Sequence, residues 1–415
     1  MRQEKVQGVS GSGREPIDLS SGHQMLNKVP EITIFFWIIK VLCTTVGETA
    51  SDFLNVNLGF GLYGTAIVAG ILLAVVLLFQ FRSKKYVPAI YWLAVVLISI
   101  FGTLVTDIMT DSIGVPLEIS TIGFTVLLII TFAIWYTNEK TLSMHSINTT
   151  KREAFYWLAI LFTFALGTAS GDLMAESLGL GYLMTGLIVL TIVVITVIAW
   201  RLGLDSVLGF WIVYIMTRPL GASLGDYLTQ PPKYSGLGLG ATLTTAIFLA
   251  AILLTVVFLS VAKIDTRVKK EVMRRAKKPA ARHSVLIQTI AVFTVLALAS
   301  GIGYYFRHMQ IMDNASVSSA DTAIVNDSGD YQAFIQIEKD ALGHVKAGDY
   351  QNAKTSADDL EFAWDQSAAV LRANDAEKWD TIDQTIDSVL RELRAVNQDE
   401  ANCISSIDTS IAAMQ

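Results

Sequence analysis

Charged residues are scarce in this chain of 415 residues, at 16% against 52% apolar residues. Soluble globular domains usually carry about a quarter charged residues. The shortage therefore excludes an ordinary soluble domain and favours a protein of the lipid bilayer. The charges are also uneven, because residues 307–415 hold 8 Lys or Arg against 20 Asp or Glu, while the whole chain has a net charge of −6. This difference indicates lipid around the first part of the chain and water around the second.

Cysteine and histidine are too few and too scattered for a soft-metal site. The two cysteines, Cys43 and Cys403, lie far apart and form neither a metal-ligand spacing nor a disulfide framework. None of the five histidines falls within the eight apolar stretches between residues 32 and 262. A disulfide and a Cys/His metal centre are therefore not expected.

The sequence also lacks the motifs of the common enzyme classes. It contains no H-E-x-x-H, no G-x-x-x-x-G-K-[ST] and no G-x-S-x-G at a strand-to-helix turn. We therefore expect no enzyme activity, no cofactor and no ATP-driven transport by this chain alone. Nucleic-acid binding is not expected either, since the basic segment 263–283 has no interleaved aromatic residues. Residues 1–30 are polar and lack the apolar core of a cleaved signal peptide, so the first membrane helix is expected to direct insertion.

Long apolar stretches dominate the first three quarters of the chain. A helix needs about 20 apolar residues to cross the hydrocarbon core. Stretches of this length occur at 32–55, 59–81, 89–111, 117–137, 154–177, 180–201, 206–229, 238–262 and 285–305. Lys and Arg concentrate in every second connection, including nine of them in 263–283. The positive-inside rule places these connections and the N-terminus in the cytoplasm of a bacterium-like cell, and residues after 306 on the periplasmic or extracellular side of its inner membrane.

A four-fold internal repeat occupies the odd-numbered stretches. In each of them a tryptophan stands ten residues before a glycine, and that glycine stands five residues before an aspartate. The repeated residues are Trp37, Gly47 and Asp52; Trp92, Gly102 and Asp107; Trp157, Gly167 and Asp172; and Trp211, Gly221 and Asp226. Each unit continues through a short outer turn into a second apolar helix. The units are therefore parallel hairpins related by an axis along the membrane normal.

These tandem two-helix units, each with a tryptophan and a Gly-x4-Asp motif, resemble a family of bacterial integral membrane proteins of unassigned function. The resemblance covers roughly residues 30–262. It implies the repeat architecture and a bacterial inner membrane, and it implies no substrate.

The repeated acids are the first candidates for an ion-binding site. Acidic groups within membrane helices are costly and usually face a protein interior or a hydrated path. Four equivalent hairpins bring four carboxylates around one axis, where oxygen ligands without Cys or His favour a hard cation such as Mg²⁺, Ca²⁺ or Mn²⁺. The candidate residues are Asp52, Asp107, Asp172 and Asp226, with Glu48, Asp111 and Glu176 close to them in sequence.

Two basic residues break the symmetry of the repeats. Lys40 lies inside the first stretch and Arg218 inside the seventh, and neither has a basic counterpart in the other repeats. They either pair with Glu48 or the aspartates, or contact an anionic substrate, and the second case would change the substrate class.

Structural roles compete with these functional ones. The aspartates also suit helix ends and caps near the outer surface. The tryptophans suit interface anchors better than ligand stacking, and the glycines suit close packing between helices. The basic segment suits a topology determinant, with anionic-lipid binding as the alternative.

The predicted fold is an all-α polytopic membrane protein with a small helical domain outside the membrane. Within the acidic tail, stretches near 329–347, 350–373 and 376–396 show helical periodicity and predict two to four amphipathic helices. The predicted division is a polar N-terminal segment at 1–30, a membrane domain at 31–262 (repeats 31–81, 89–137, 154–201 and 206–262), a basic linker at 263–284, a ninth membrane helix at 285–306 and an extracytoplasmic helical domain at 307–415.

Two functions fit this organisation. The first is a secondary transporter or permeation pathway for a small ion, with a hard cation as the expected species and Glu48 as a proton-coupling group. The second is a membrane sensor or scaffold that anchors the outer domain and transmits its binding state; an intramembrane enzyme is a distant third. Expected partners are membrane lipid, a small ion or solute, and a second copy of the chain.

Overall fold

The computed structural model describes residues 27–57, 60–113, 115–229, 236–262, 287–292, 294, 301, 305, 331–395 and 398–415. The regular secondary structure in these ranges is helical, with no strand among them, as the sequence predicts. The predicted linker 263–284 lies outside the described residues. The same holds for most of the predicted ninth membrane helix, of which only a few positions are described.

Eight helices of the described part are long and apolar enough to cross a membrane, which confirms the eight stretches predicted between residues 32 and 262. Their length and apolar composition suit the hydrocarbon core of a bilayer. A helix also pairs its own backbone polar groups, for which lipid offers no partner. The helices are α1 (Ile34–Asp52), α2 (Gly61–Arg82), α3 (Pro88–Asp107), α4 (Leu117–Glu139), α5 (Thr150–Asp172), α6 (Tyr182–Leu202), α7 (Ser206–Thr229) and α8 (Ala241–Ala262).

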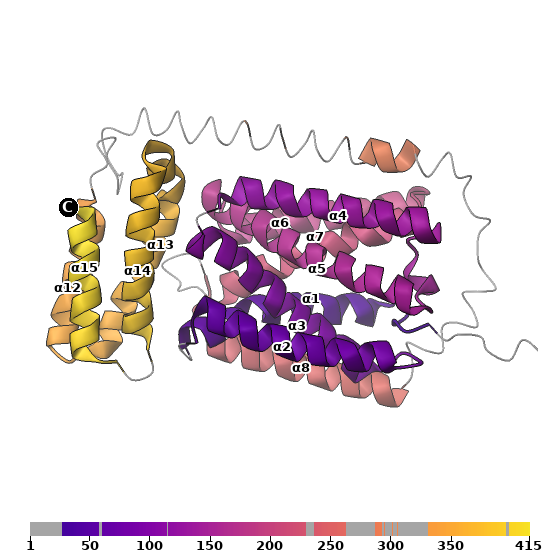
Figure 1. Ribbon diagram of the computed structural model, residues 1–415, viewed down its shortest axis with the longest axis horizontal. Coiled ribbons are helices and arrows are strands. Elements are labelled where there is room, and N and C mark those ends of the chain that lie inside the picture. The colour runs from indigo at the N-terminus through magenta and orange to yellow at the C-terminus, as the bar shows by residue number, and fades with distance from the viewer. Residues whose placement is uncertain are drawn as a thin grey trace, which may run out of the picture.

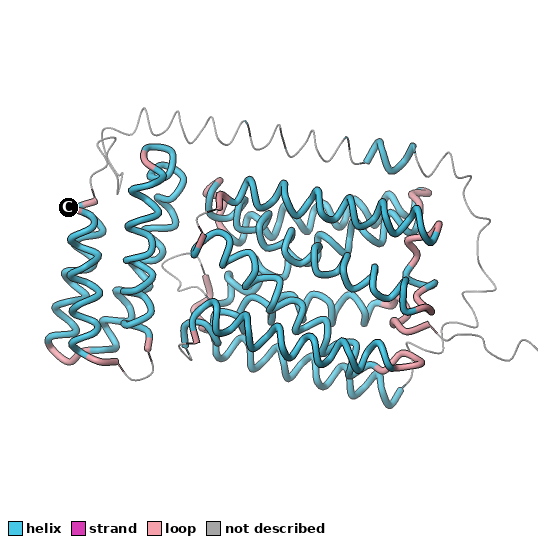
Figure 2. Tube along the Cα trace, viewed as in Figure 1, coloured by secondary structure: helices cyan, strands magenta, loops and turns pink. Residues whose placement is uncertain are grey.

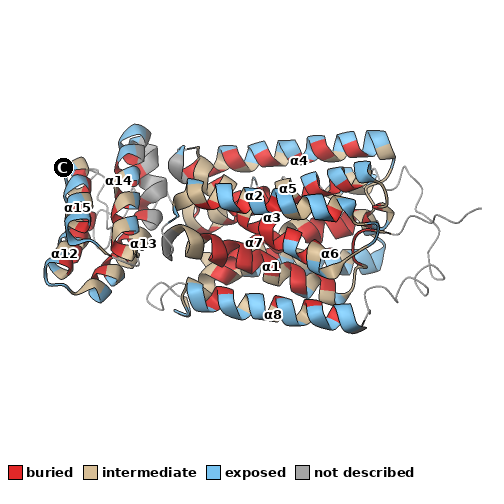
Figure 3. Ribbon diagram, turned by 60° about the horizontal axis from the view of Figure 1, so that its bottom comes forward, coloured by how far each residue is buried: buried red, intermediate tan, exposed pale blue. Residues whose placement is uncertain are grey.

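The eight helices form two layers (Figures 1 and 3). The inner helices α1, α3, α5 and α7 contact one another in that order, and α7 returns to α1 to close a ring. The outer helices α2, α4, α6 and α8 each pack on the inner helix of the next repeat, so α2 lies on α3 and α8 lies on α1. Outer helices expose large aliphatic side chains such as Ile67, Ile122 and Leu253, as expected of a lipid-facing surface.

The motif glycines mark the closest contacts of the inner ring. At each of them a side chain from the next inner helix occupies the space that a Cβ would need. A Cβ on Gly47 would lie 1.9 Å from Ser99 Oγ, and one on Gly221 would lie 1.9 Å from Thr44 Oγ1. The four pairs run around the ring as Gly47 with Ser99, Gly102 with Phe164, Gly167 with Arg218 and Gly221 with Thr44. Glycine therefore lets neighbouring inner helices approach closely.

Aromatic side chains close the ring at its other end. The residue before each motif tryptophan packs against the tryptophan of the next repeat. The ring centroids are 5.5 Å apart for Phe36 and Trp92, 5.5 Å for Tyr91 and Trp157, 6.3 Å for Tyr156 and Trp211, and 5.7 Å for Phe210 and Trp37. The same contact thus recurs four times around one axis, as parallel repeats require. Trp92, Trp157 and Trp211 are at most 4% exposed, so these indoles lie inside the bundle and not against lipid.

The acidic tail contains four described helices with a core of their own. They are α12 (Gln332–Lys346), α13 (Tyr350–Asn374), α14 (Ala376–Arg394) and α15 (Glu400–Met414). Asp349, Asp375 and Asp399 cap α13, α14 and α15, because each side chain accepts a hydrogen bond from a backbone N–H of the first turn. The fourth helix, α15, follows the three stretches that the sequence analysis singles out. We call α12 to α15 the tail bundle.

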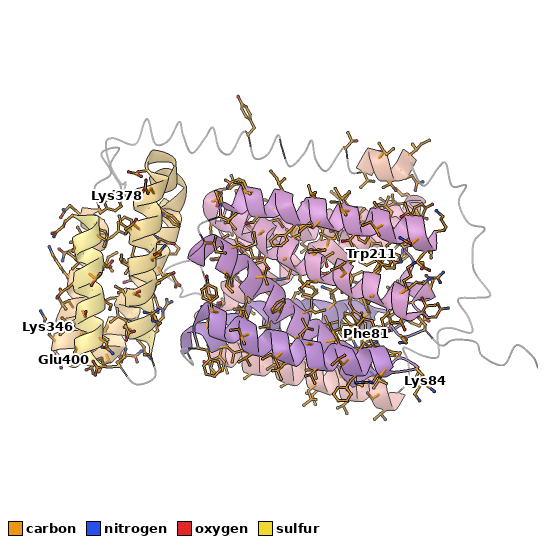
Figure 4. All side chains as sticks on the ribbon, in the orientation of Figure 1. Phe81, Lys84, Trp211, Lys346, Lys378 and Glu400 are labelled. Atoms are coloured by element: carbon orange, nitrogen blue, oxygen red, sulfur yellow. The ribbon has the colours of Figure 1, made fainter. Side chains whose placement is uncertain are left out.

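The tail bundle packs on one end of the membrane domain, with its helices running across the direction of the membrane helices (Figures 1 and 2). Its helix α13 contacts the turn Leu173–Ser177, and α14 contacts the turns Phe53–Asn57 and Ile108–Ser112. These turns directly follow the motif aspartates, so we call this the aspartate end. Trp211 and Lys84 lie in the half of the membrane domain away from the tail bundle (Figure 4), and we call that the tryptophan end.

Candidate functional site

A row of residues at four-residue steps runs along each inner helix, from the residue before the tryptophan to the motif aspartate, and contains five positions. Each step turns by about 40° around the helix, so the row winds gradually round the helix. The first four positions are buried on all four helices, while the aspartates are half-buried. These axial positions are Phe36, Lys40, Thr44, Glu48 and Asp52 on α1; Tyr91, Val95, Ser99, Thr103 and Asp107 on α3; Tyr156, Ile160, Phe164, Thr168 and Asp172 on α5; and Phe210, Tyr214, Arg218, Ala222 and Asp226 on α7.

Contacts across the ring show that the charged side chains reach its axis. Arg218 on α7 donates a hydrogen bond of 2.5 Å to Thr103 Oγ1 on α3, the helix opposite. Lys40 on α1 places Nζ 4.0 Å from the centroid of the Phe164 ring on α5, which is also opposite. The Tyr214 ring of the neighbouring α7 lies 4.3 Å from the same ammonium, which makes two cation–π contacts. The side chains of Lys40 and Arg218 therefore reach across the interior of the ring.

Arg218 also forms the central ion pair of the domain. Its Nη2 lies 2.5 Å from Oε2 of Glu48 on α1. From the sequence, Lys40 and Arg218 either pair with acids or face a ligand. In the structure the two residues differ, because only Arg218 has an acidic partner among the described residues. Arg218 pairs with Glu48 through one nitrogen, while its Nε and Nη1 atoms and the Lys40 Nζ atom have no hydrogen-bond acceptor among the described residues.

Three of the four motif aspartates lie in one region at the aspartate end. The Asp226 carboxylate interacts electrostatically with Glu48, Asp52, Asp172 and Glu176, which come from α1, α5 and the turn after α5. Glu176 also accepts a hydrogen bond of 3.0 Å from the Tyr182 hydroxyl. Asp107 occupies the same axial position on α3, and the side chain of Asp111 lies outside the described residues. Asp52, Asp172 and Asp226 thus share one region with two further acids.

The motif aspartates do not end their helices. After Asp52, Asp107 and Asp172 the chain continues in a π-helical turn of five residues. Asp107 and Asp172 accept no capping hydrogen bond from these turns, and α7 runs on to Thr229 beyond Asp226. The motif aspartates therefore do not act as simple helix ends or caps. The π-helical turns form the last turn of each of these three helical segments, before the loop to the next helix.

The acids do not form a compact metal cage in the part of the chain that is described. No group of three His, Cys, Asp or Glu residues there has the geometry to hold a metal ion. The carboxylates instead make a region of negative charge, which Asp52 extends towards Glu361 and Arg394 of the tail bundle.

A second buried ion pair, at the tryptophan end, escapes the sequence analysis. Lys28 Nζ lies 2.6 Å from Oε2 of Glu153, which is fully buried in the first turn of α5. Gln80 donates a hydrogen bond of 2.9 Å to the other oxygen of Glu153, and Lys28 donates one of 2.9 Å to the Phe81 carbonyl. The available signal was an acid directly before the apolar stretch 154–177. This pair ties the N-terminal segment to α2 and α5.

The tryptophan end is also closed by tyrosines. The hydroxyl groups of Tyr91 and Tyr156 lie 2.5 Å apart on neighbouring inner helices, within the ring of aromatic contacts. Both residues occupy the first axial position, so this hydrogen bond lies at the tryptophan end of the row of axial positions.

These features define a multi-pass membrane protein whose inner ring of four helices carries charged residues along its axis. Four stretches of the chain, at residues 35–86, 90–141, 155–202 and 209–265, match the repeat described as Repeat of Unknown Function (DUF347). The matches cover just over half of the chain, so the protein belongs to this repeat family, which confirms the predicted four tandem repeats. No curated protein and no solved structure is significantly similar to it.

Proposed function

We propose that the membrane domain is a secondary transporter or permeation pathway for a small ion, with the path along the axis of α1, α3, α5 and α7. One observation carries this proposal, namely that ionisable side chains occupy axial positions at several depths of a membrane-spanning ring. Buried ionisable groups in membrane helices are costly and commonly mark ion pathways or proton relays. A purely structural bundle gains nothing from charges placed on its central axis.

The carboxylates at the aspartate end are the proposed entry region. Their shared negative charge attracts cations and concentrates them at the mouth of the path, which supports the hard-cation expectation for Asp52, Asp107, Asp172 and Asp226. Glu48 is the proposed proton-coupling group. Protonation of its carboxylate would remove the charge that holds Arg218, so proton binding would change the contact that joins α1 and α7.

The conformation described here is closed. At the tryptophan end the aromatic ring and the contact between Tyr91 and Tyr156 fill the axis. At the aspartate end the tail bundle covers the π-helical turns. Alternating access would require both closures to open in turn, and the π-helical turns after Asp52, Asp107 and Asp172 are the proposed sites of backbone adjustment at the entry.

The proposed location is a bacterial inner membrane, with the aspartate end and the tail bundle on the extracytoplasmic side. The acidic tail and the basic residues at the opposite end support this orientation. Lipid surrounds the outer helices in this arrangement.

The test is ion flux through the full-length protein in proteoliposomes. We expect the double variant Asp172→Asn with Asp226→Asn to lose at least tenfold of the flux, measured for Mg²⁺, Mn²⁺, K⁺ and chloride. Asp408→Asn is the matched control, because Asp408 is an exposed acid on α15 and its loss changes only surface charge. Unchanged flux in a correctly folded double variant would reject this role for the acids.

A sensor or scaffold is the second candidate function, and the contact between the tail bundle and the aspartate end favours it. Asp52 interacts electrostatically with Glu361 and Arg394 of the tail bundle, so a change in the bundle reaches the acids of the membrane domain. Deletion of residues 313–415 separates the two functions. A transporter retains some flux without its tail, whereas a sensor loses its response while the membrane domain still inserts.

A further inference from the structure

The buried charges on the axis do not balance. Lys40 and Arg218 are 1% and 0% exposed, and Glu48 is the one acid with a direct ion pair to either of them among the described residues. When Lys40, Arg218 and Glu48 are all charged, this part of the ring carries an excess of one positive charge.

The donors of the two basic residues are also unmatched. Lys40 Nζ faces the rings of Phe164 and Tyr214 and has no acceptor in the described part of the chain. Arg218 uses Nη2 for Glu48 and Thr103, while Nε and Nη1 remain without an acceptor there. A buried cationic donor without an acceptor loses several kcal/mol of solvation, so such groups usually have a bound counter-ion or release their proton. Unmatched donors from two cations favour an acceptor that carries negative charge.

We propose that Lys40 and Arg218 together bind a small monovalent anion on the axis of the inner ring. This site rests on the proposed transport function, and it identifies the ion bound at the centre of the proposed path. Lys40 and Arg218 occupy successive axial positions on the neighbouring helices α1 and α7. An ammonium and a guanidinium on neighbouring helices suit a halide or a short carboxylate such as formate as a shared acceptor. The excess of one positive charge fits an anion of charge −1.

A cation is a poor occupant of this level, because it would meet two positive charges in a region of low dielectric constant. The hard-cation expectation therefore applies to the aspartate end and not to the centre of the ring. An anion entering from the aspartate end passes the converging acids, and protonation of these acids would remove the repulsion between them and the anion.

The experiment measures anion binding to the full-length protein in detergent. Chloride, formate and gluconate are compared at equal ionic strength, by calorimetry and by thermal unfolding. We expect chloride or formate to bind and to raise the unfolding temperature, whereas gluconate is too large for the site. Lys40→Met removes the ammonium while keeping the length of the side chain, and we expect at least tenfold weaker binding. Lys151→Met is the matched control, because Lys151 lies at an exposed pair with Glu139.

Arg218→Lys provides a second variant if Lys40→Met does not fold. It keeps a positive charge opposite Glu48 but removes the two unmatched N–H groups, and we expect it to weaken anion binding as well. Equal stabilisation by all three salts, or equal anion affinity of Lys40→Met and Lys151→Met, would overturn the site. Flux distinguishes the two proposals. Anion binding without flux of any ion refutes transport and leaves the site, whereas cation flux without anion binding refutes the site and leaves transport.

Discussion

Replacement of Gly167 by alanine is expected to disrupt the ring at the level of Arg218. A Cβ at this position would lie 2.4 Å from Arg218 Cγ, 2.5 Å from Arg218 Cβ and 3.0 Å from Pro219 Cδ. These distances are far below van der Waals contact. The atoms are also close to the α7 backbone, so a rotamer change alone cannot relieve the clash. Helix α7 has to move away from α5, which displaces the guanidinium from Glu48 and Thr103.

The size of the effect follows from two opposing contributions. Overpacking in a well-packed core costs about 1–3 kcal/mol, while alanine gains up to about 1 kcal/mol over glycine in a helix. The strained contact to Arg218 puts Gly167→Ala at the upper end of the first range, for a net loss of about 2 kcal/mol. If most of this loss accelerates unfolding, the half-life of the folded protein shortens by about thirtyfold at a fixed temperature.

Gly171→Ala on the same helix is the matched control. A Cβ there would lie 3.5 Å from Pro219 Cβ, which is an ordinary contact. We expect this variant to be as stable as the parent protein or slightly more stable, because it gains helix propensity without a clash. The assay is loss of monodisperse protein in detergent against time at several temperatures. Equal half-lives for Gly167→Ala and Gly171→Ala would refute the ring packing described above.

Two further predictions concern buried acids outside the axis. Burial raises the pKa of Glu338, in α12 of the tail bundle, from 4.5 to about 8, although the Ser410 hydroxyl partly offsets this. Because the folded-state pKa is the higher one, the contribution of Glu338 to stability is complete below pH 4.5, and about 3 kcal/mol of it is lost between pH 5 and pH 8. Hydrogen exchange of α12 and α15 should show this loss, and Glu338→Gln should abolish it. Glu153→Gln leaves Lys28 buried without a counter-charge and should cost about 3 kcal/mol. Glu139→Gln, at a more exposed pair, should lower the stability much less in the same thermal assay.

The repeat motif was sufficient to predict much of the fold. Hydropathy placed the eight membrane helices, and the spacing of Trp37, Gly47 and Asp52 with its three copies indicated parallel hairpins around one axis. Helical periodicity also puts Glu48, four residues before Asp52, on the same face as this aspartate. These features depend on neighbouring or repeated residues, so a single sequence is enough to predict them.

Contacts between distant segments were not predictable in the same way. The sequence offered the pairing of Arg218 with Glu48, 170 residues apart, as one of two alternatives. The choice between them depends on the order of the inner helices around the ring, which periodicity does not specify. Lys28 pairs with Glu153 for a similar reason, because the N-terminal segment folds back onto α5. The π-helical turns after the aspartates were missed since Asp and Gly also suit helix ends, and no sequence rule separates an end from a π-helical continuation.

Three charged residues that each occur in only one repeat connect the symmetric scaffold to its proposed activity. Positions that pack neighbouring helices, such as Gly47 and the aromatic residues beside the tryptophans, recur in every repeat and hold the ring together. Lys40, Glu48 and Arg218 each occupy an axial position at which the other three repeats carry an uncharged residue. Four copies of any one of them would place four like charges on one axis at close range, which a low-dielectric interior does not tolerate. A single copy of each permits one ion pair and leaves one cation free for a ligand, so the loss of symmetry at these levels is what allows a charged path within a symmetric bundle.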